Sequence, residues 1–158
     1  MYVVQMKASK LKRLFSWYGP YFGAGIKVEH ISDDWRYCRV SMKLRWYNRN
    51  AVGVHFGGSL YAMVDPHYML LLMKSLGKEY TVWDQAAQIE FRRPGKGYVY
   101  AEFMVTDDML EDIHQRTKSG EKYCPTYQVT IKDEDDKTVC DVKKTLYIRK
   151  IPQTGSRL

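Results

Sequence analysis

The chain has 158 residues, the size of one domain, and its 25 Lys and Arg residues outnumber 18 Asp and Glu residues, giving a net charge of +7. A hydrophobic content of 45% is enough for a normal core, and 27% charged residues are ordinary for a soluble protein. The three cysteines lack CxxC spacing, which argues against a zinc site or a disulfide framework. The positive charge favours anionic partners such as nucleic acid, acidic membranes or a phosphate-bearing cofactor.

The first segment of the chain predicts an amphipathic helix. Apolar residues recur at helical spacing in residues 7–18, and basic residues occupy the other faces. We expect this helix, within residues 1–20, to dock on the domain or on a partner subunit, and a helix on a membrane surface is the alternative. Gly19 and Pro20 predict its end. No secretory signal or membrane span is visible, so we expect a cytoplasmic protein.

Six later segments have the pattern of strands: residues 26–31, 36–46, 80–93, 98–105, 123–132 and 138–149. In the second of these, period-two alternation predicts one inward face made of Cys38, Val40, Met42, Leu44 and Trp46. Residues 80–93 carry small and polar side chains on both faces, which suggests packing against a partner subunit. A short helix is expected to begin near Asp107, residues 133–136 should form a hairpin tip, and the tail 152–158 should fray.

The segment from Gly57 to Leu76 predicts the central element of the fold. Its stretch from Leu60 to Met73 is apolar almost all the way round, which is typical of a buried helix, and it is too short and too interrupted to span a bilayer. Asp65 lies inside it, and a buried carboxylate is costly unless it is paired or protonated. We therefore expect one α+β domain over residues 1–158, with an N-terminal amphipathic helix (1–20), a core (25–150) and a tail (151–158). In the core, a curved antiparallel sheet wraps around one long buried central helix.

Five residues of this region fall into a known register: Asn50, Gly53, Gly57, Gly58 and Asp65. The pattern resembles that of the phenylacetyl-CoA-type (PaaI-type) acyl-CoA thioesterases of the hotdog-fold superfamily. Residues 91–98 are similar to the strand-turn-strand segment that follows the helix in those enzymes. Residues 56–66 and 82–84 look closer to a group of thioesterase-like hotdog domains. The resemblance covers residues 25–150 and implies a hotdog fold and acyl-CoA thioesterase activity.

The sequence departs from that family pattern at two positions. The family His before the glycine pair is Phe56 here, and the nearest imidazole is His55. Asp65 is followed by Pro66, which removes a backbone hydrogen bond and should kink the helix.

Thioester hydrolysis needs a polarised carbonyl and an activated water. The amides of Gly57 and Gly58 open the helix without intrahelical partners, so they can form an oxyanion hole. Asp65 lies about two turns further on, about 10 Å away, which is too far to act on the same carbonyl. Asp65, acting as general base or alternatively as nucleophile, must then come from a second subunit, and the resemblance implies such sites across a dimer. The alternative is a structural Asp65 that bonds to a Tyr, a backbone amide or a partner chain.

Other polar residues near the helix have two interpretations each. His67 cannot pair with Asp65, because residues two apart point to different sides of a helix, so we expect a satisfied core or interface residue. His55 could orient the substrate or be merely exposed. Asn50 could position water or the carbonyl, or it could serve only as a turn residue.

The substrate-binding candidates fall into two groups. Three basic residues could bind the phosphates of coenzyme A or form a solvated hairpin end: Arg92, Arg93 and Lys96. An aromatic and Met stripe could line an acyl pocket or belong to the core: Tyr61, Tyr68, Met69 and Leu72. No metal site and no cofactor are expected, apart from coenzyme A as part of the substrate.

The sequence thus favours a thioesterase that hydrolyses a small-molecule acyl-CoA as a homodimer or a dimer of dimers. The alternative is a hotdog domain that binds an acyl-CoA or another acyl ligand without turnover. A nucleic-acid binder would rest on charge alone, because no RNP, KH or helix-turn-helix signature is present. A dehydratase of this fold is disfavoured, because the Asp-His pair that such enzymes use has no clear counterpart.

Overall fold

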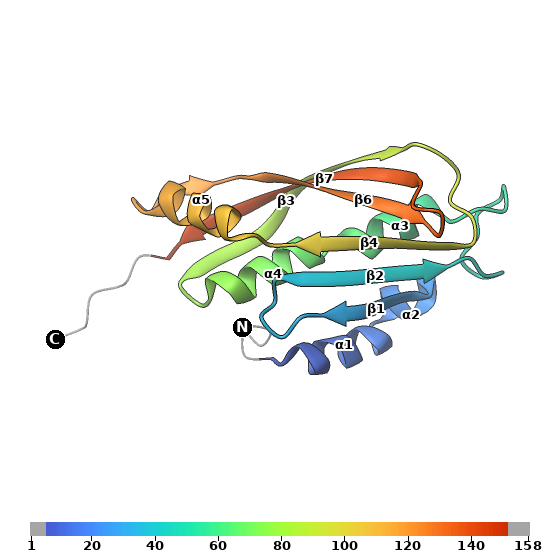
Figure 1. The fold of residues 1–158 in the computed structure, drawn as a ribbon, viewed down its shortest axis with the longest axis horizontal. Helices are drawn as coiled ribbons and strands as arrows, with labels where there is room; N and C mark the ends of the chain where they lie inside the picture. The colour runs from blue at the N-terminus through green and yellow to red at the C-terminus, as the bar shows by residue number, and fades with distance from the viewer. Residues whose placement is uncertain (1–5, 152–158) are drawn as a thin grey trace.

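A computed structural model describes residues 6–151, and it shows a curved antiparallel sheet with helices packed along it (Figure 1). The strands are β1 (Ile26–Ile31), β2 (Tyr37–Lys43), β3 (Tyr80–Phe91), β4 (Tyr98–Met104), β5 (Lys122–Tyr123), β6 (Thr126–Asp133) and β7 (Thr138–Lys150). The helices are α1 (Ala8–Trp17), α2 (Gly19–Ala24), α3 (Gly57–Val64), α4 (His67–Leu76) and α5 (Asp107–Thr117). Of the predicted tail, residues 152–158 lie outside the described part of the chain.

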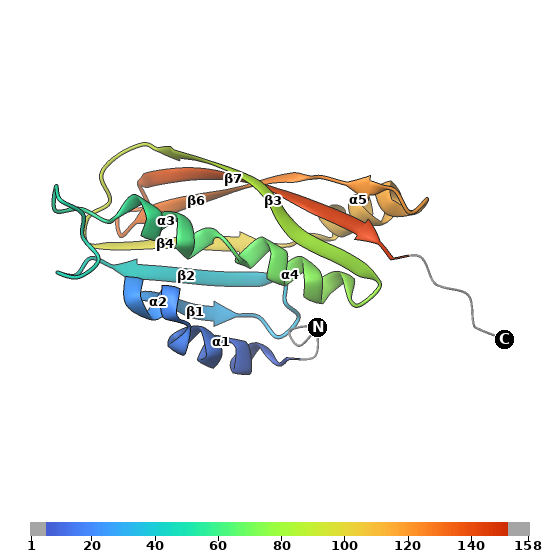
Figure 2. The same ribbon diagram turned by 180° about the vertical axis from the view of Figure 1, so that it is seen from behind.

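The sheet has seven strands in the order β1-β2-β4-β6-β7-β3, with the short β5 paired to β7, and every pairing is antiparallel. Strands β1 and β3 are therefore its two edges. The helix pair α3 and α4 runs across one face of the curved sheet, while α1 and α2 lie beside β1 (Figure 2). Within residues 6–151 no helix is long and apolar enough to cross a bilayer.

The predicted strand 36–46 is shorter in the structure, because β2 ends at Lys43. Arg45 N donates to Asn48 Oδ1 over 2.7 Å, and this turn bends the chain away from the sheet. Cys38, Val40 and Met42 are buried as predicted. Trp46 was expected on the same inward face, but it is exposed because it lies beyond the last sheet residue. That part of the prediction is wrong.

The segment predicted as one long helix consists of α3 and α4, with a break at Asp65 and Pro66. Both residues keep right-handed helical dihedrals, so the chain continues in roughly the same direction. Pro66 has no N–H, so one backbone hydrogen bond is missing there. The apolar side chains of both helices form the centre of the core, as the sequence indicates: Leu60, Met63, Val64, Leu71 and Leu72.

The N-terminal region contains two helices. Helix α1 buries Ala8, Leu11 and Phe15. Gly19 and Pro20, expected to end the helical region, instead begin α2, where a proline in the first turn costs no hydrogen bond. Gly25 ends α2 with φ 71°, and a Cβ there would lie 2.9 Å from the Tyr47 hydroxyl. Only glycine fits this close contact between α2 and the loop after β2.

His67 is enclosed in the core between α2, β2 and α4. Its Nε2 lies 2.8 Å from the Tyr21 hydroxyl, and its Nδ1 lies 3.6 Å from Cys38 Sγ. Burial lowers the pKa of His67 from 6.5 to about 3, so the ring is neutral at ordinary pH. The structure confirms the interpretation of His67 as a satisfied core residue.

This buried ring predicts a specific acid sensitivity. The pKa of His67 is lower in the folded chain than in the unfolded chain. The contribution of the neutral ring to the stability of the fold is therefore complete above about pH 6.5 and is lost as the pH falls toward 3. The free energy of unfolding should fall by up to about 1.4 kcal/mol per pH unit through this one proton. Urea unfolding at a series of pH values measures this dependence. For His67→Gln, the free energy of unfolding should change less steeply with pH in that range than it does for the wild type, whereas His30→Gln, at an exposed position, should match the wild type. Equal slopes for all three proteins would contradict a neutral buried His67.

Candidate functional site

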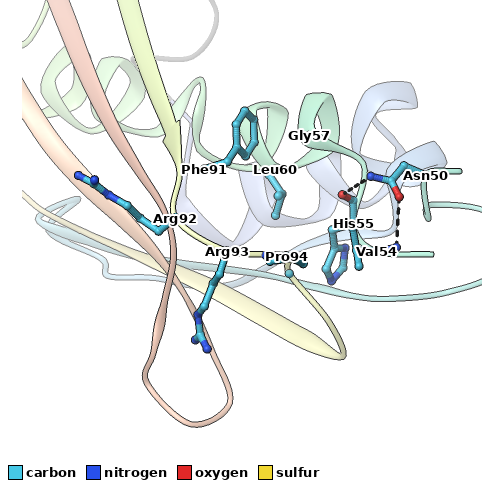
Figure 3. Close-up of a pocket in the computed structure, with 10 residues that line it drawn as sticks. Asn50, Val54, His55, Gly57, Leu60, Phe91, Arg92, Arg93 and Pro94 are labelled. Carbon is cyan, nitrogen blue, oxygen red and sulfur yellow. Dashed lines mark hydrogen bonds between the residues drawn. The ribbon is translucent and has the colours of Figure 1, made fainter. Parts of the chain in front are cut away.

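A cavity of about 480 Å³ opens beside the N-terminus of α3 (Figure 3). It brings together the loop before α3 and the turn after β3, which are more than thirty residues apart in sequence. Ten residues line it: Asn50, Val54, His55, Gly57, Leu60, Phe91, Arg92, Arg93, Pro94 and Gly95. The structure therefore assembles five predicted site residues around one space: Asn50, His55, Gly57, Arg92 and Arg93.

His55 joins the two segments that form the cavity. Its backbone N donates to Gly95 O over 3.0 Å, and its Nε2 lies 3.1 Å from Gly97 O. A carbonyl can only accept, so Nε2 carries the proton and Nδ1 is an acceptor. Nδ1 is buried and has no hydrogen-bond partner within the described residues. Burial lowers the pKa of His55, so the ring is neutral, and the alternative of a merely exposed His55 is wrong.

Asn50 holds the loop in shape. Its Oδ1 accepts from the backbone amides of Val52 and Val54, at 3.1 and 3.2 Å. Its Nδ2 lies 3.5 Å from His55 O. The side chain therefore does what a turn residue does, although it also borders the cavity.

Two glycines and two aromatic rings form the start of α3. In the described chain, the amides of Gly57 and Gly58 donate no hydrogen bond, as expected for the first helical turn. A Cβ on Gly57 would lie 3.0 Å from Phe91 Cζ, and one on Gly58 would lie 2.5 Å from Phe56 Cε1. The glycines thus leave room for rings that flank the free amides. The Phe56 side chain offers no hydrogen-bonding group there.

A second polar cluster lies at the other end of α3. Asp65 Oδ1 accepts from the Tyr61 hydroxyl at 2.7 Å and from Lys144 Nζ at 2.8 Å. Lys144 Nζ also lies 3.1 Å from Asp84 Oδ1 and 3.1 Å from the Tyr61 hydroxyl. Lys144 is fully buried, whereas 45% of the Asp65 side chain is exposed. One ammonium thus serves two carboxylates, and the Asp65 carboxylate reaches the surface of the single chain.

The pKa shifts in this acidic cluster have different signs. Burial raises the pKa of Asp65, but hydrogen bonds from Lys144 and Tyr61 outweigh it and lower the pKa overall. For Asp84, burial raises the pKa and the nearby Lys144 offsets this only in part. Burial disfavours the charged form of Lys144, yet the hydrogen bonds that its ammonium donates to Asp65 and Tyr61 raise its pKa. Asp65 is therefore ionised and Lys144 protonated at neutral pH.

Lys144 and Asp84 were not singled out from the sequence as site residues. A signal for Lys144 existed, because β7 alternates and Lys144 falls in the inward register between Val142 and Leu146. A lysine at an inward position needs a counter-charge, and Asp65 was the acidic residue of the facing helix. Asp84 lies next to a register shift in β3, and the sequence gives no sign of that irregularity.

The two predicted phosphate-binding arginines are paired with carboxylates. Arg92 lies 2.6 Å from Glu90 and 2.9 Å from Asp141. Arg93 lies 2.7 Å from Asp133. Lys96 is exposed on the turn. A phosphate at Arg92 or Arg93 would have to compete with these carboxylates.

The predicted acyl-pocket residues do not line the cavity. The Tyr68 hydroxyl donates to Gln128 O at 3.1 Å, and its ring packs against Phe103 and Tyr127, so it belongs to the core. Met69 is half-buried and Leu72 is fully buried. Within residues 6–151 no group of His, Cys, Asp and Glu side chains could hold a metal ion.

Three solved structures share this fold at low sequence identity. A Pseudomonas aeruginosa protein described as a probable thioesterase gives a TM-score of 0.81 at 17% identity, over 92% of this chain and 97% of that one. A Haemophilus influenzae thioesterase gives 0.67 at 17% identity, over 96% of both chains. The E. coli PaaI protein of the phenylacetic acid degradation operon gives 0.61 at 16% identity, over 90% and 91%. The likeness identifies the hotdog fold that the sequence predicted.

The sequence model of one protein family also matches the chain. It is described as a domain of unknown function (DUF4442) and covers residues 7–148. A search of curated protein sequences found no match.

Proposed function

Because this chain belongs to the DUF4442 family, a thioesterase-like family, and has the hotdog fold, we propose that it hydrolyses the thioester of an acyl-CoA. One observation carries the proposal most directly. Asp65 is held ionised by Lys144 and Tyr61 through Oδ1, while the same carboxylate is half exposed at the break between α3 and α4. Within the described residues no hydrogen bond occupies its Oδ2, which leaves one oxygen for a water molecule.

Thioester hydrolysis also requires a polarised carbonyl, and the free amides of Gly57 and Gly58 can bind the carbonyl oxygen. They open α3 at the edge of the cavity, where the positive end of the helix dipole favours a developing negative charge. The rings of Phe56 and Phe91 flank them. Since Phe56 replaces the family His, backbone amides alone would stabilise the oxyanion.

The base and the oxyanion hole belong to different protomers in this proposal. Asp65 is not among the residues that line the cavity, and eight residues of helix correspond to about 12 Å. Strand β3 is an edge of the sheet with an exposed central stretch at residues 85–88, which suits pairing with a second copy. A dimer would then place Asp65 of the partner subunit opposite the Gly57 amide.

The reaction then follows ordinary acyl-transfer chemistry. A water oxygen attacks the thioester carbonyl carbon while the partner's Asp65 accepts the water proton. The carbonyl oxygen becomes an oxyanion bound by the amides of Gly57 and Gly58. When the tetrahedral intermediate collapses, the carbon–sulfur bond breaks, the proton passes to the thiolate, and free coenzyme A and a carboxylic acid leave.

The phosphates of coenzyme A would bind at the far rim of the cavity. Arg92 and Arg93 line it, and Lys96 lies on the adjoining turn. In the absence of ligand, their carboxylate partners hold the guanidinium groups in place, and a phosphate would exchange for them.

Two observations favour the alternative of an acyl-ligand binder without turnover. Phe56 provides no hydrogen bond where the related enzymes have His, and Asn50 is already engaged in its own loop. Such a domain would keep the cavity and the aromatic rings but would not position a water molecule to attack the thioester carbonyl.

Single-turnover release of free coenzyme A, measured by a thiol reagent over a panel of acyl-CoAs, tests the proposal. Wild-type protein should release the thiol, and Asp65→Asn should slow release by about 10²–10⁴-fold. Asp108→Asn, on the exposed first turn of α5, is the matched control and should retain the full rate. Tight binding of an acyl-CoA with no release by the wild type would favour the binding alternative.

A further inference from the structure

One end of the molecule carries two neighbouring segments whose exposed large apolar side chains include Trp17, Tyr18, Phe22, Trp46, Tyr47 and Val52. We call this surface the aromatic end. Trp17 is 82% exposed, and Trp46 and Val52 are each 80% exposed. Scattered apolar residues on a surface are normal, but three tryptophan and phenylalanine rings at one end of a domain are not.

The two segments of the aromatic end are joined by specific contacts. Asn48 Nδ2 donates to Ala24 O over 2.8 Å, which ties the loop after β2 to the end of α2. The rings of Trp17 and Phe22 are stacked, with centroids 6.4 Å apart. Figures 1 and 2 show α2 and the segment between β2 and α3 at the same end of the sheet, with the latter extending beyond the strands. The segments that carry the exposed rings therefore lie together at one end of the molecule.

The charge on these two segments has one sign. Residues 6–25 and 43–58 contain no Asp or Glu, although the whole chain has 18. Five basic side chains on these segments are exposed and form no salt bridge within the described residues: Lys10, Arg13, Lys43, Arg45 and Arg49. The acidic β6–β7 turn also lies toward this end. Its Asp133 and Asp135 are paired with Arg93 and Lys137, and Asp136 accepts a hydrogen bond from the Tyr100 hydroxyl, so Glu134 is the turn's acidic residue that has neither an ion pair nor this bond within the described residues.

We propose that the aromatic end binds the surface of an anionic lipid bilayer. Trp and Tyr side chains favour the interface between headgroups and acyl chains, and exposed Lys and Arg are attracted to anionic headgroups. The surface projects as helix ends and loop tips, which suits shallow insertion better than it suits a groove-binding peptide. Nucleic acid would match the charge, and single strands could stack bases on the exposed rings, but it would leave the aliphatic Val52 without an apolar environment.

Sedimentation of the full chain with vesicles tests this proposal without any catalytic assay. The wild type should bind vesicles that contain phosphatidylglycerol, with a blue shift in tryptophan emission, and should bind pure phosphatidylcholine more weakly. Replacing Trp17 and Trp46 together by Ala should lower the bound fraction at least tenfold. Arg45→Gln with Arg49→Gln should weaken binding about fivefold for each lost charge.

Trp83→Ala is the matched control, because this partly exposed tryptophan lies on β3, which begins at the opposite end of the sheet (Figure 1). It should bind vesicles as the wild type does. Unfolding temperatures of all variants identify any that fail to fold. A folded wild type that ignores anionic vesicles, or a Trp17/Trp46 variant that binds them equally well, would overturn the proposal. So would binding to duplex DNA, or self-association through these tryptophans, in place of vesicle binding.

Discussion

A one-to-one mixture of Asp65→Asn chains and Gly57→Pro chains is expected to recover about a quarter of the wild-type thioesterase rate. Each variant alone should lose about 10²-fold or more, because one lacks the base and the other lacks an oxyanion donor. In a mixed dimer, one of the two sites combines an intact α3 N-terminus with an intact partner's Asp65. Half of the dimers are mixed, and half of their sites are complete.

The structure indicates that Gly57→Pro removes the amide hydrogen without breaking the helix. Gly57 is the first residue of α3, where a proline costs no intrahelical hydrogen bond. Phe56 precedes it with φ −64° and ψ 128°, the extended conformation that a residue before proline prefers. Gly57→Ala brings a Cβ to the same contact with Phe91 but keeps the amide, so it should remain active.

The mixture is prepared by unfolding and refolding the two variants together, and the oligomeric state is measured by sedimentation. If the dimers exchange chains and the mixture is still no more active than its components, the Asp65 carboxylate and the Gly57 amide do not meet across an interface. The assignment of the hotdog fold would survive that result, since it does not depend on where the catalytic base lies.

The fold was largely predictable, and the exceptions have physical reasons. Alternation marked β2, β6 and β7, because one face of each of these strands is buried in the core. Alternation failed at Trp46, because the turn bond from Arg45 to Asn48 ends the strand and sequence periodicity does not report on turns. Helix α2 was missed because a Gly-Pro pair is a stop signal in most contexts and a start signal only at the first turn.

The segments that form the candidate site were predictable from the sequence, but the contacts between them were not. The segment around Gly57 and the turn after Phe91 were both singled out, but their meeting depends on the backbone bond from His55 to Gly95, which no spacing reveals. The arginines were predicted either to bind phosphate or to form a solvated hairpin end. Their partners Asp133 and Asp141 come from strands whose pairing had to be known first. Lys144 was not singled out, although its position between Val142 and Leu146 falls in the inward register of β7.

The largest effect on stability is expected at the acidic cluster around Lys144. Asp65→Asn combined with Asp84→Asn leaves a fully buried ammonium without a counter-charge, which should cost about 3–5 kcal/mol of the free energy of unfolding. Each single variant retains one carboxylate beside Nζ and should cost less than half of that. Adding Lys144→Met to the double variant should restore most of the loss, because an apolar side chain of similar length then fills the site.

The same cluster predicts the dependence of stability on pH. The raised pKa of Lys144 means that its stabilisation is present below about pH 10.4, the ordinary lysine value, and is lost as the pH rises through the folded value. The lowered pKa of Asp65 means that its stabilisation is present above about pH 3.9 and is lost as the pH falls through the folded value. Lys144→Met should remove the loss of unfolding free energy at alkaline pH. Lys143→Met, one residue away and exposed, should not remove it.

Urea unfolding of the wild type and these variants measures the coupling among the three charges. Non-additivity is the decisive quantity, because a shared buried ammonium makes the double carboxylate variant far less stable than the sum of the single ones. Additive losses at Asp65 and Asp84, or no recovery on adding Lys144→Met, would mean that Lys144 finds water or another partner. In that case Lys144 could not be what holds Asp65 ionised, and the lowered pKa of that carboxylate would lose its main physical cause.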